Sequence, residues 1–188
     1  MLNRLKNFLF VGLRIQKYRL LSTCARTSGR PECVFPLLMR GAGSIEFGSG
    51  VQNGIINAHH YYSGYNYILA MEPGSQVTIG DGVVLGNGCS LQAVSRISIG
   101  EKSMIGVNCF LVDTDGHDLH PERRMDGQAQ SAPITIGRNV WIFYNSVVLK
   151  GVTIGDNSVI GAGSVVTGDI PANVFAAGNP ARVIKSLA

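Results

Sequence analysis

The sequence is poor in charged and aromatic residues and has no long apolar run. Asp, Glu, Lys and Arg make up 15% of its 188 residues, Phe, Trp and Tyr 7%, and the net charge is +4. So modest a charge, without a basic and aromatic stripe, argues against a nucleic-acid partner. No apolar run approaches the roughly 18 residues that a transmembrane helix needs. We therefore expect a single domain that neither binds nucleic acid nor spans a bilayer.

Cysteine pairs with metal-ligand spacing are also missing. The four cysteines are Cys24, Cys33, Cys89 and Cys109, and none of them forms a C-x-x-C pair. Such a pattern supports neither a zinc site nor the disulfide framework of a small secreted domain. We predict reduced thiols in a cytoplasmic protein, with Cys89 and Cys109 in the core and no bound metal.

What the sequence does have is a six-residue period. Every sixth position holds an aliphatic residue, here called an anchor, and Gly or a small residue follows at fixed offsets. The anchors are Ile79, Leu85, Leu91, Ile99, Ile105, Leu111, Ile136, Ile142, Val148, Ile154, Ile160 and Val166. Helices repeat apolar residues at about 3.6 and half-buried strands at about 2, so neither explains six. A coil with three flat walls does, because each wall contributes one inward anchor. The period predicts an all-β solenoid, a parallel β-helix of hexapeptide repeats.

Interruptions of the period divide the chain. We expect an N-terminal helix and irregular first coils over 1–75, the β-helix over 76–170, and a C-terminal cap with a basic tail over 171–188. The period breaks at 112–133, where histidines, aspartates and arginines gather. A polar loop extruded from a rigid solenoid is a common place for function.

The first 25 residues predict a helix in which leucines and phenylalanines alternate with arginines and lysines. No small-residue cleavage site follows a clean apolar core, so the segment is a poor signal peptide. We expect this helix to pack on its own solenoid or on a neighbouring subunit. Peripheral contact of residues 2–21 with an anionic membrane is the alternative.

Four segments carry a resemblance to a known family: HDLHPERR at 117–124, PITIGRNVWI at 133–142, GVTIGDNSVIGAGSVVT at 151–167 and GNPARVIK at 178–185. They resemble the hexapeptide-repeat acyltransferases, especially the maltose and galactoside acetyltransferases and the bacterial polysaccharide O-acetyltransferases. The resemblance covers roughly residues 76 to 187. It implies a left-handed β-helix, a homotrimer with active sites between subunits, and acetyl-CoA as acyl donor.

The same resemblance implies roles for residues of the 112–133 loop. His117 matches the general base, which accepts a proton from a sugar hydroxyl as the oxygen attacks the thioester. Asp115, and with it Asp113, is expected to orient the imidazole or bind sugar hydroxyls, with turn capping as the alternative. His120 contacts the acceptor or is only part of the loop surface. The remaining acceptor candidates are Asn108 and Arg123.

The donor site is implied by matches in the C-terminal coils. The residues expected to bind acetyl-CoA are Trp141, Tyr144, Ala162, Thr167, Pro180, Arg182 and Lys185. Basic side chains suit the CoA phosphates because such contacts are charge-assisted. Phe143 and Tyr144 depart from the family pattern, which has Gly and a small residue there, and Gly168 replaces a common basic residue.

These observations lead to a main hypothesis and its alternatives. The main hypothesis is an acetyl-CoA-dependent O-acetyltransferase that acts directly on a sugar hydroxyl of a saccharide or surface polysaccharide. N-acetylation of an amino sugar, nucleotide sugar or antibiotic is the alternative enzyme. A trimer that is only a scaffold is a further alternative, motivated by the departures at Phe143, Tyr144 and Gly168. A γ-type carbonic anhydrase would need a His spacing that His117 and His120 do not offer.

Overall fold

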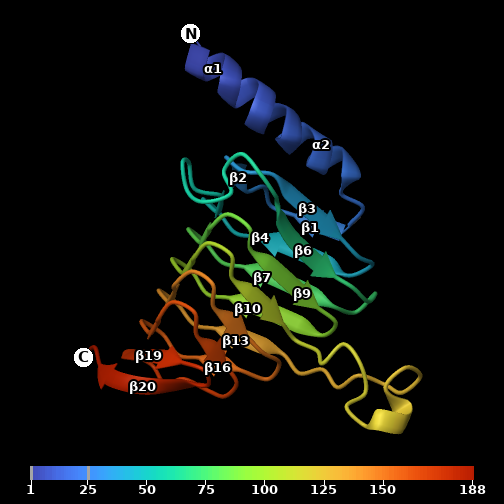
Figure 1. Cartoon of the computed structure of the whole chain (residues 1–188), viewed down its shortest axis with the longest axis vertical. Helices are drawn as coiled ribbons and strands as arrows, with labels where there is room; N and C mark the ends of the chain where they lie inside the picture. The colour runs from blue at the N-terminus through green and yellow to red at the C-terminus, as the bar shows by residue number, and fades with distance from the viewer. Residues whose placement is uncertain (1, 25) are drawn as a thin grey trace.

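The computed structural model describes residues 2–24 and 26–188 and shows a three-sided prism of stacked coils (Figure 1). A helix lies across the N-terminal end of the prism, and a long loop projects from it near the opposite end. The prism is a left-handed parallel β-helix: the hexapeptide period predicts the parallel β-helix, and the family resemblance implies its left hand. Within the described residues, no helix combines the length and hydropathy needed to cross a bilayer.

Each wall of the prism is one sheet of stacked parallel strands. Sheet A contains β1 (Arg26–Ser28), β4 (Ser44–Phe47), β7 (Gln76–Ile79), β10 (Arg96–Ile99), β13 (Ile134–Ile136) and β16 (Thr153–Ile154). Sheet B contains β2 (Glu32–Cys33), β5 (Gln52–Asn53), β8 (Val84–Leu85), β11 (Met104–Ile105), β14 (Trp141–Ile142), β17 (Val159–Ile160), β19 (Val174–Gly178) and β20 (Ala181–Ser186). Sheet C contains β3 (Leu37–Arg40), β6 (Asn66–Ala70), β9 (Ser90–Ala93), β12 (Phe110–Val112), β15 (Val147–Val148) and β18 (Val165–Val166).

The anchors form the core of the prism. Every anchor is buried, and anchors in neighbouring coils stack in register, as Ile105 does on Ile142 and Ile142 on Ile160. This confirms the interpretation of the period. The slip between Leu91 and Ile99 does not disturb the stacking, because the extra residues bulge out at the corner between sheets C and A.

The glycines that follow the anchors allow neighbouring coils to approach closely. A Cβ built on Gly100 would lie 2.5 Å from the carbonyl oxygen of Gly137, and one on Gly86 would lie 2.6 Å from the backbone nitrogen of Val107. These glycines are therefore required by close approach of the coils rather than by an unusual φ. The positive φ angles fall two residues later, at Asn108 and Asn145 for example, because Asn tolerates the left-handed conformation.

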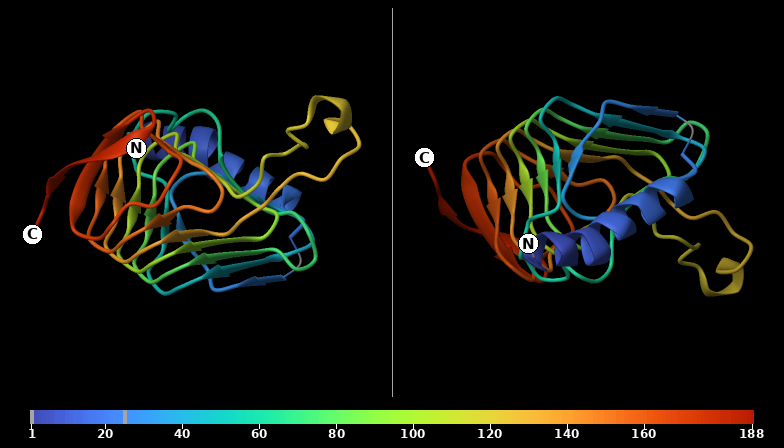
Figure 2. Two further views of the ribbon diagram at one scale, coloured as in Figure 1. Left: turned by 90° about the horizontal axis from the view of Figure 1, so that it is seen from below. Right: turned by 90° about the horizontal axis from the view of Figure 1, so that it is seen from above.

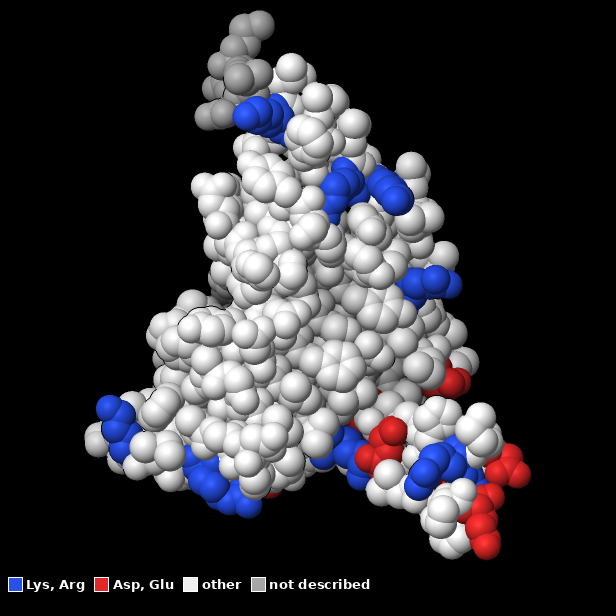
Figure 3. All heavy atoms as spheres, viewed as in Figure 1, with Lys and Arg blue, Asp and Glu red and all other residues white. Residues whose placement is uncertain are grey.

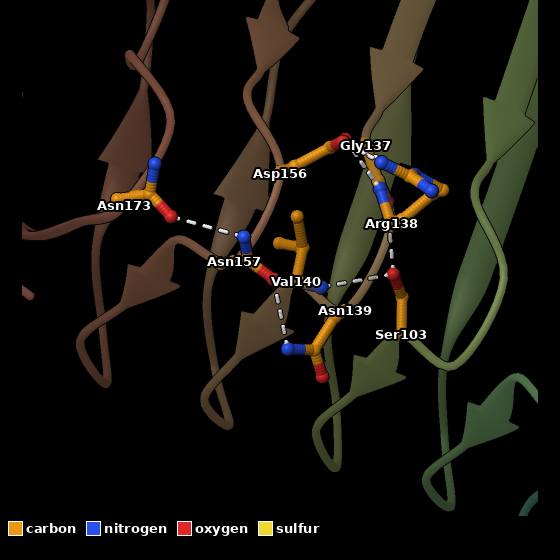
Figure 4. Close-up of polar contacts among 8 residues, drawn as sticks. All are labelled: Ser103, Gly137, Arg138, Asn139, Val140, Asp156, Asn157 and Asn173. Atoms are coloured by element: carbon orange, nitrogen blue, oxygen red, sulfur yellow. Dashed lines mark hydrogen bonds and ion pairs between the residues drawn. The ribbon is translucent and has the colours of Figure 1, made fainter. Parts of the chain in front are cut away.

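Hydrogen bonds between coils follow the corner that joins sheets A and B (Figure 4). The amide of Asn139 donates to Asn157 at 3.0 Å, and that of Asn157 donates to Asn173 at 2.9 Å. The buried hydroxyl of Ser103 donates to the carbonyl of Gly137 at 2.9 Å. The asparagine side chains thus link neighbouring coils to one another, and the Ser103 hydroxyl gives a backbone carbonyl of the next coil a partner.

The four cysteines are free thiols, and Cys89 and Cys109 are buried inside the coil as predicted. Burial raises the pKa of both thiols, and for Cys109 the value is about 11. Because the thiolate is the nucleophilic form, neither side chain is suited to a covalent acyl-enzyme step.

The ends of the chain differ in part from expectation. The N-terminal helix runs through α1 (Leu2–Asn7), a π-helical turn η1 (Phe8–Gly12) and α2 (Leu13–Leu21), so it ends earlier than expected; residues 1 and 25 lie outside the described set. The first coils are regular from β1 onward, apart from an excursion at 54–65 between β5 and β6. The expected basic tail is strand β20, which pairs antiparallel with β19.

Candidate active site

The 112–133 loop leaves the prism at the corner between sheets C and A, after β12, and returns in β13 (Figures 1 and 2). An isolated bridge between Thr114 and Ser131 holds the base of the loop together, and a short 3-10 helix, η2 (Pro121–Arg123), lies near its tip. Most of its side chains are exposed, among them Leu119 and Met125. The loop therefore presents its histidines away from the body of its own chain.

His117 is exposed on this loop, and one of its ring nitrogens has a defined partner. Its Nδ1 lies 3.0 Å from the carbonyl oxygen of Arg124. A carbonyl oxygen can only accept, so Nδ1 carries the hydrogen in the neutral ring. This leaves the lone pair on Nε2, which is the tautomer a general base requires.

Asp115 differs from the expectation that it orients His117, because the Arg124 carbonyl makes that contact instead. The Oδ2 atom of Asp115 lies 3.4 Å from Nζ of Lys150 and has no hydrogen-bond partner. The two groups thus form an ion pair without hydrogen-bond geometry. This pair ties the base of the loop to the next coil of the prism, so Asp115 supports the loop's position.

Asp113 is fully buried and acts as a turn cap. Its two carboxylate oxygens accept from the backbone N–H groups of Val94 and Ser95 at 2.7 and 2.8 Å. These bonds stabilise the turn that joins β9 to β10 in the preceding coil. No oxygen of Asp113 is open to a sugar, so the structure supports the turn-capping alternative and we leave this residue out of the acceptor site.

His120 and Arg123 hold the tip of the loop in shape. Nδ1 of His120 accepts from the N–H of Glu122 at 3.3 Å and caps the 3-10 helix. Arg123 donates from Nε to Asp118 at 3.1 Å. Both side chains remain exposed, so these internal contacts leave the rest of each group available to a ligand.

The corner between sheets B and C carries a different set of candidates. Val107, Tyr144 and Ala162 stack in one column there, since the N–H of Asn145 donates to the carbonyl of Val107 and that of Gly163 donates to the carbonyl of Tyr144. Tyr144 and Ala162 are both exposed. This column gives an extended ligand a continuous edge to follow along the coils.

The column ends in a cavity of about 420 Å³ lined by His59, His60, Val107, Asn108, Tyr144 and Asn145. The Asn108 amide donates to Asn145 at 2.8 Å, and the two imidazoles meet edge to face at 4.0 Å between ring centres. Buried Asn87 positions the 54–65 excursion by donating to the carbonyls of Ile55 and His59.

His59 and His60 are not among the site residues expected from the sequence. The signal for them is the run of histidine, tyrosine and asparagine at 57–67, whose aromatic and short polar groups suit sugar contacts in general terms. It could not be assigned to a site, because the excursion has no period and its neighbours come from coils about 50 and 85 residues further along the chain.

The outer surface of sheet B places the remaining donor candidates in a row. Trp141, Val159, Phe175 and Lys185 are neighbours across successive strands. Trp141 is 41% exposed and stacks on Phe143, with ring centres 4.1 Å apart.

The other three donor candidates, Pro180, Arg182 and Thr167, are also exposed. Arg182 lies on β20, and Pro180 lies in the turn before it. Thr167 follows β18, at the other end of sheet C from Ala162. The structure therefore brings most donor candidates together on one side of the chain, but not Thr167.

The candidates thus form two half-sites at the two corners of the prism that flank sheet C. One, at the corner with sheet A, contains the His117 loop and Thr167; the other, at the corner with sheet B, contains the cavity, Tyr144 and Ala162. One copy of the chain does not unite them. Among the described residues, no group of three or more His, Cys, Asp or Glu side chains has metal-binding geometry.

Comparisons with known proteins agree with this geometry. Two family models match the chain: "Bacterial transferase hexapeptide (six repeats)" over residues 133–168 and "Hexapeptide repeat of succinyl-transferase" over residues 76–93. The galactoside O-acetyltransferase of Escherichia coli K12 is 48% identical over 114 residues, which cover 61% of this chain and 56% of that protein. The chain spans 56% to 64% of the length of the curated relatives it matches.

Two solved structures extend the likeness over nearly the whole chain. A galactoside acetyltransferase in complex with coenzyme A is 31% identical with a TM-score of 0.50, covering 94% of this chain and 82% of that one. A hexapeptide-repeat acetyltransferase from Vibrio cholerae O1 biovar eltor, complexed with acetyl coenzyme A, is 25% identical with a TM-score of 0.60, covering 99% and 85%.

Proposed function

Because this chain belongs to the hexapeptide-repeat transferase family, we propose that it is an acetyl-CoA-dependent O-acetyltransferase acting on a sugar hydroxyl. The observation that carries the proposal is the geometry of His117, whose Nδ1–H is fixed on the Arg124 carbonyl while Nε2 stays free. A trimer that served only as a scaffold would not need a histidine held in this tautomer. We assign the protein to the cytoplasm, where free thiols such as these stay reduced.

The proposed reaction is a direct transfer. Nε2 of His117 accepts the proton of the sugar hydroxyl while its oxygen attacks the thioester carbonyl. Collapse of the tetrahedral intermediate breaks the carbon–sulfur bond and releases the CoA thiolate, which takes the proton from the imidazolium. The products are an acetyl ester and CoA. No cysteine takes part, in keeping with the burial of Cys89 and Cys109.

The proposed active site lies between two subunits of a homotrimer. In a closed ring with three-fold symmetry, the loop of one chain meets the corner between sheets B and C of the next, so each interface completes one site. The separation of the two half-sites along sheet C supports this arrangement. The exposed Leu119 and Met125 of the loop gain a surface to pack against in such a ring.

Within that interface, acetyl-CoA follows the column of Val107, Tyr144 and Ala162, with its phosphates toward Arg182 and Lys185 and its acetyl group toward the cavity. Asn108, with His59 and His60, then faces the acceptor. Imidazole, amide and phenol groups suit a sugar because each can exchange hydrogen bonds with hydroxyls. Tyr144 closes one side of the cavity, where the family has a small residue.

CoA binding provides a test of the donor site that needs no acceptor. We expect calorimetry to show micromolar binding of CoA that weakens about tenfold for dephospho-CoA, since a charge-assisted phosphate contact contributes roughly 1.5 kcal/mol. Arg182→Gln should bring the two affinities together. Arg96→Gln, an exposed arginine on sheet A, is the matched control. Equal affinity for both ligands in the unaltered protein would contradict the assigned phosphate contacts.

The product distinguishes O-acetylation from N-acetylation. Incubation with acetyl-CoA and a panel of galactosides, maltosides and their amino-sugar counterparts should yield a product acetylated at a hydroxyl, including from acceptors that have no amine. Such a product is an ester, so mild alkali should release acetate from it, whereas an amide resists this treatment. An alkali-stable product formed only from amino sugars would replace the proposed function by N-acetylation.

A further inference from the structure

The N-terminal helix has an outward surface that its own prism does not cover. Val11 is buried against Phe35 and Tyr61, and Ile15 packs beside them. By contrast Phe8 is 59% exposed, Phe10 57% and Leu20 86%. Figure 1 shows this helix lying beyond the first coil. The other large apolar side chains of the segment that stay exposed are Leu5, Leu9, Leu13 and Leu21.

The N-terminal helix and the strand that follows it, β1, carry only positive charge, and the first acidic residue of the chain is Glu32 in β2. Between residues 1 and 31 the sequence contains Arg4, Lys6, Arg14, Lys17, Arg19, Arg26 and Arg30 and no aspartate or glutamate. The ion pairs among the described residues all lie elsewhere. On the face shown in Figure 3, blue spheres mark the helix, whereas red spheres gather over the distant 112–133 loop.

A cavity of about 590 Å³ opens beneath α2 at the same end of the prism. Its apolar wall includes Leu37, Met39 and Phe47, and its charged lining residues are Arg19, Arg30 and Glu32. Both guanidinium groups lie near Cys33, where they oppose the rise in the pKa of this thiol that burial causes. The cavity thus combines an apolar interior with two cations and one carboxylate, and its net positive charge suits the head and upper acyl chain of an anionic lipid.

We propose that the N-terminal end of the prism docks on an anionic lipid bilayer. The segment Leu5–Leu21 lies in the interface plane with its phenylalanines and leucines among the acyl chains, and Lys6, Lys17 and Arg19 contact lipid phosphates. Arg14 and Arg26 instead donate to carbonyl groups of their own chain. Apolar burial and charge attraction each contribute to such binding. Arg19 and Arg30 receive one anionic headgroup in the cavity.

The positive charge of the N-terminal helix favours an anionic membrane over a second copy of the chain as its binding partner. Two such helices would bring Lys6, Arg14, Lys17 and Arg19 of each copy together, with no acidic residue on either helix, and like charges at close range repel. In the proposed trimer, three-fold symmetry strengthens binding to a membrane. The three helices then lie at one height along the three-fold axis and meet a flat surface together, so weak contacts add.

Vesicle co-sedimentation of the full chain tests the proposal. We expect binding to vesicles of phosphatidylcholine with 30% phosphatidylglycerol and little binding to phosphatidylcholine alone, with the difference reduced by salt. Arg19→Gln/Arg30→Gln should lower the partition coefficient by about 30-fold, given about 1 kcal/mol for each basic residue at the surface. Phe8→Ser/Phe10→Ser should also abolish most binding.

The matched control is Arg96→Gln/Lys102→Gln, which removes the same charge from exposed positions away from the helix. Circular dichroism and thermal unfolding verify that each variant folds, which we expect because Val11 and Ile15 are kept. Equal binding to both vesicle types, or unchanged binding of the Arg19 and Arg30 variant, would overturn the proposal. So would assemblies larger than a trimer that disappear in the Phe8 and Phe10 variant, since the helix would then join copies of the chain.

Discussion

Replacing His117 by Ala should lower kcat/KM for acetyl transfer by about 10²–10⁴, which is the usual contribution of a general base. Affinity for CoA should stay unchanged, because the proposed phosphate contacts come from Arg182 and Lys185 and the imidazole has no role in holding the phosphates. Steady-state kinetics with a sugar acceptor and calorimetry with CoA measure the two effects separately.

Two further variants separate catalysis from loop structure. His120→Ala removes a cap of the 3-10 helix and should cost far less activity than His117→Ala. His117→Gln keeps a side chain able to donate to the Arg124 carbonyl but supplies no base, so it should be as inactive as the alanine variant. A His117→Gln enzyme with most of its activity would mean that the imidazole only positions the loop.

Replacing Gly100 by Ala should destabilise the protein by about 1–3 kcal/mol, as expected for an overpacked interior. The added Cβ would lie 2.5 Å from the carbonyl oxygen and 2.6 Å from the carbonyl carbon of Gly137. Both atoms belong to the backbone of the next coil, so no side chain can rotate away and the coils themselves must separate. For a chain of this size the midpoint of thermal unfolding should fall by several degrees.

Gly168→Ala is the matched control for this effect. Its added Cβ meets no atom within 4 Å, and its φ is not positive, so the same chemical change should leave the unfolding midpoint nearly unaltered. Scanning calorimetry on the two variants and the unaltered protein makes the comparison. A Gly100→Ala protein as stable as the Gly168→Ala protein would show that the coils can move apart without loss.

The sequence by itself determined the repeating part of this protein. The aliphatic anchors predict the parallel β-helix because six residues match one wall of a coil, and the structure buries and stacks each one, as with Leu85, Ile105 and Ile142. The break in the period also marked both ends of the 112–133 loop, since only residues outside the coil escape the spacing. The six-residue spacing can be recognised in the sequence because every regular coil repeats it.

Only the tertiary structure decided what the irregular segments contact. Asp113 and Asp115 are two residues apart in the sequence, yet one caps a turn of the preceding coil and the other pairs with Lys150 of the following one. His59 and His60 meet Asn108 and Tyr144 because stacking brings distant coils to one corner. Such contacts depend on which residues the stacking superimposes, and no spacing along the chain encodes them.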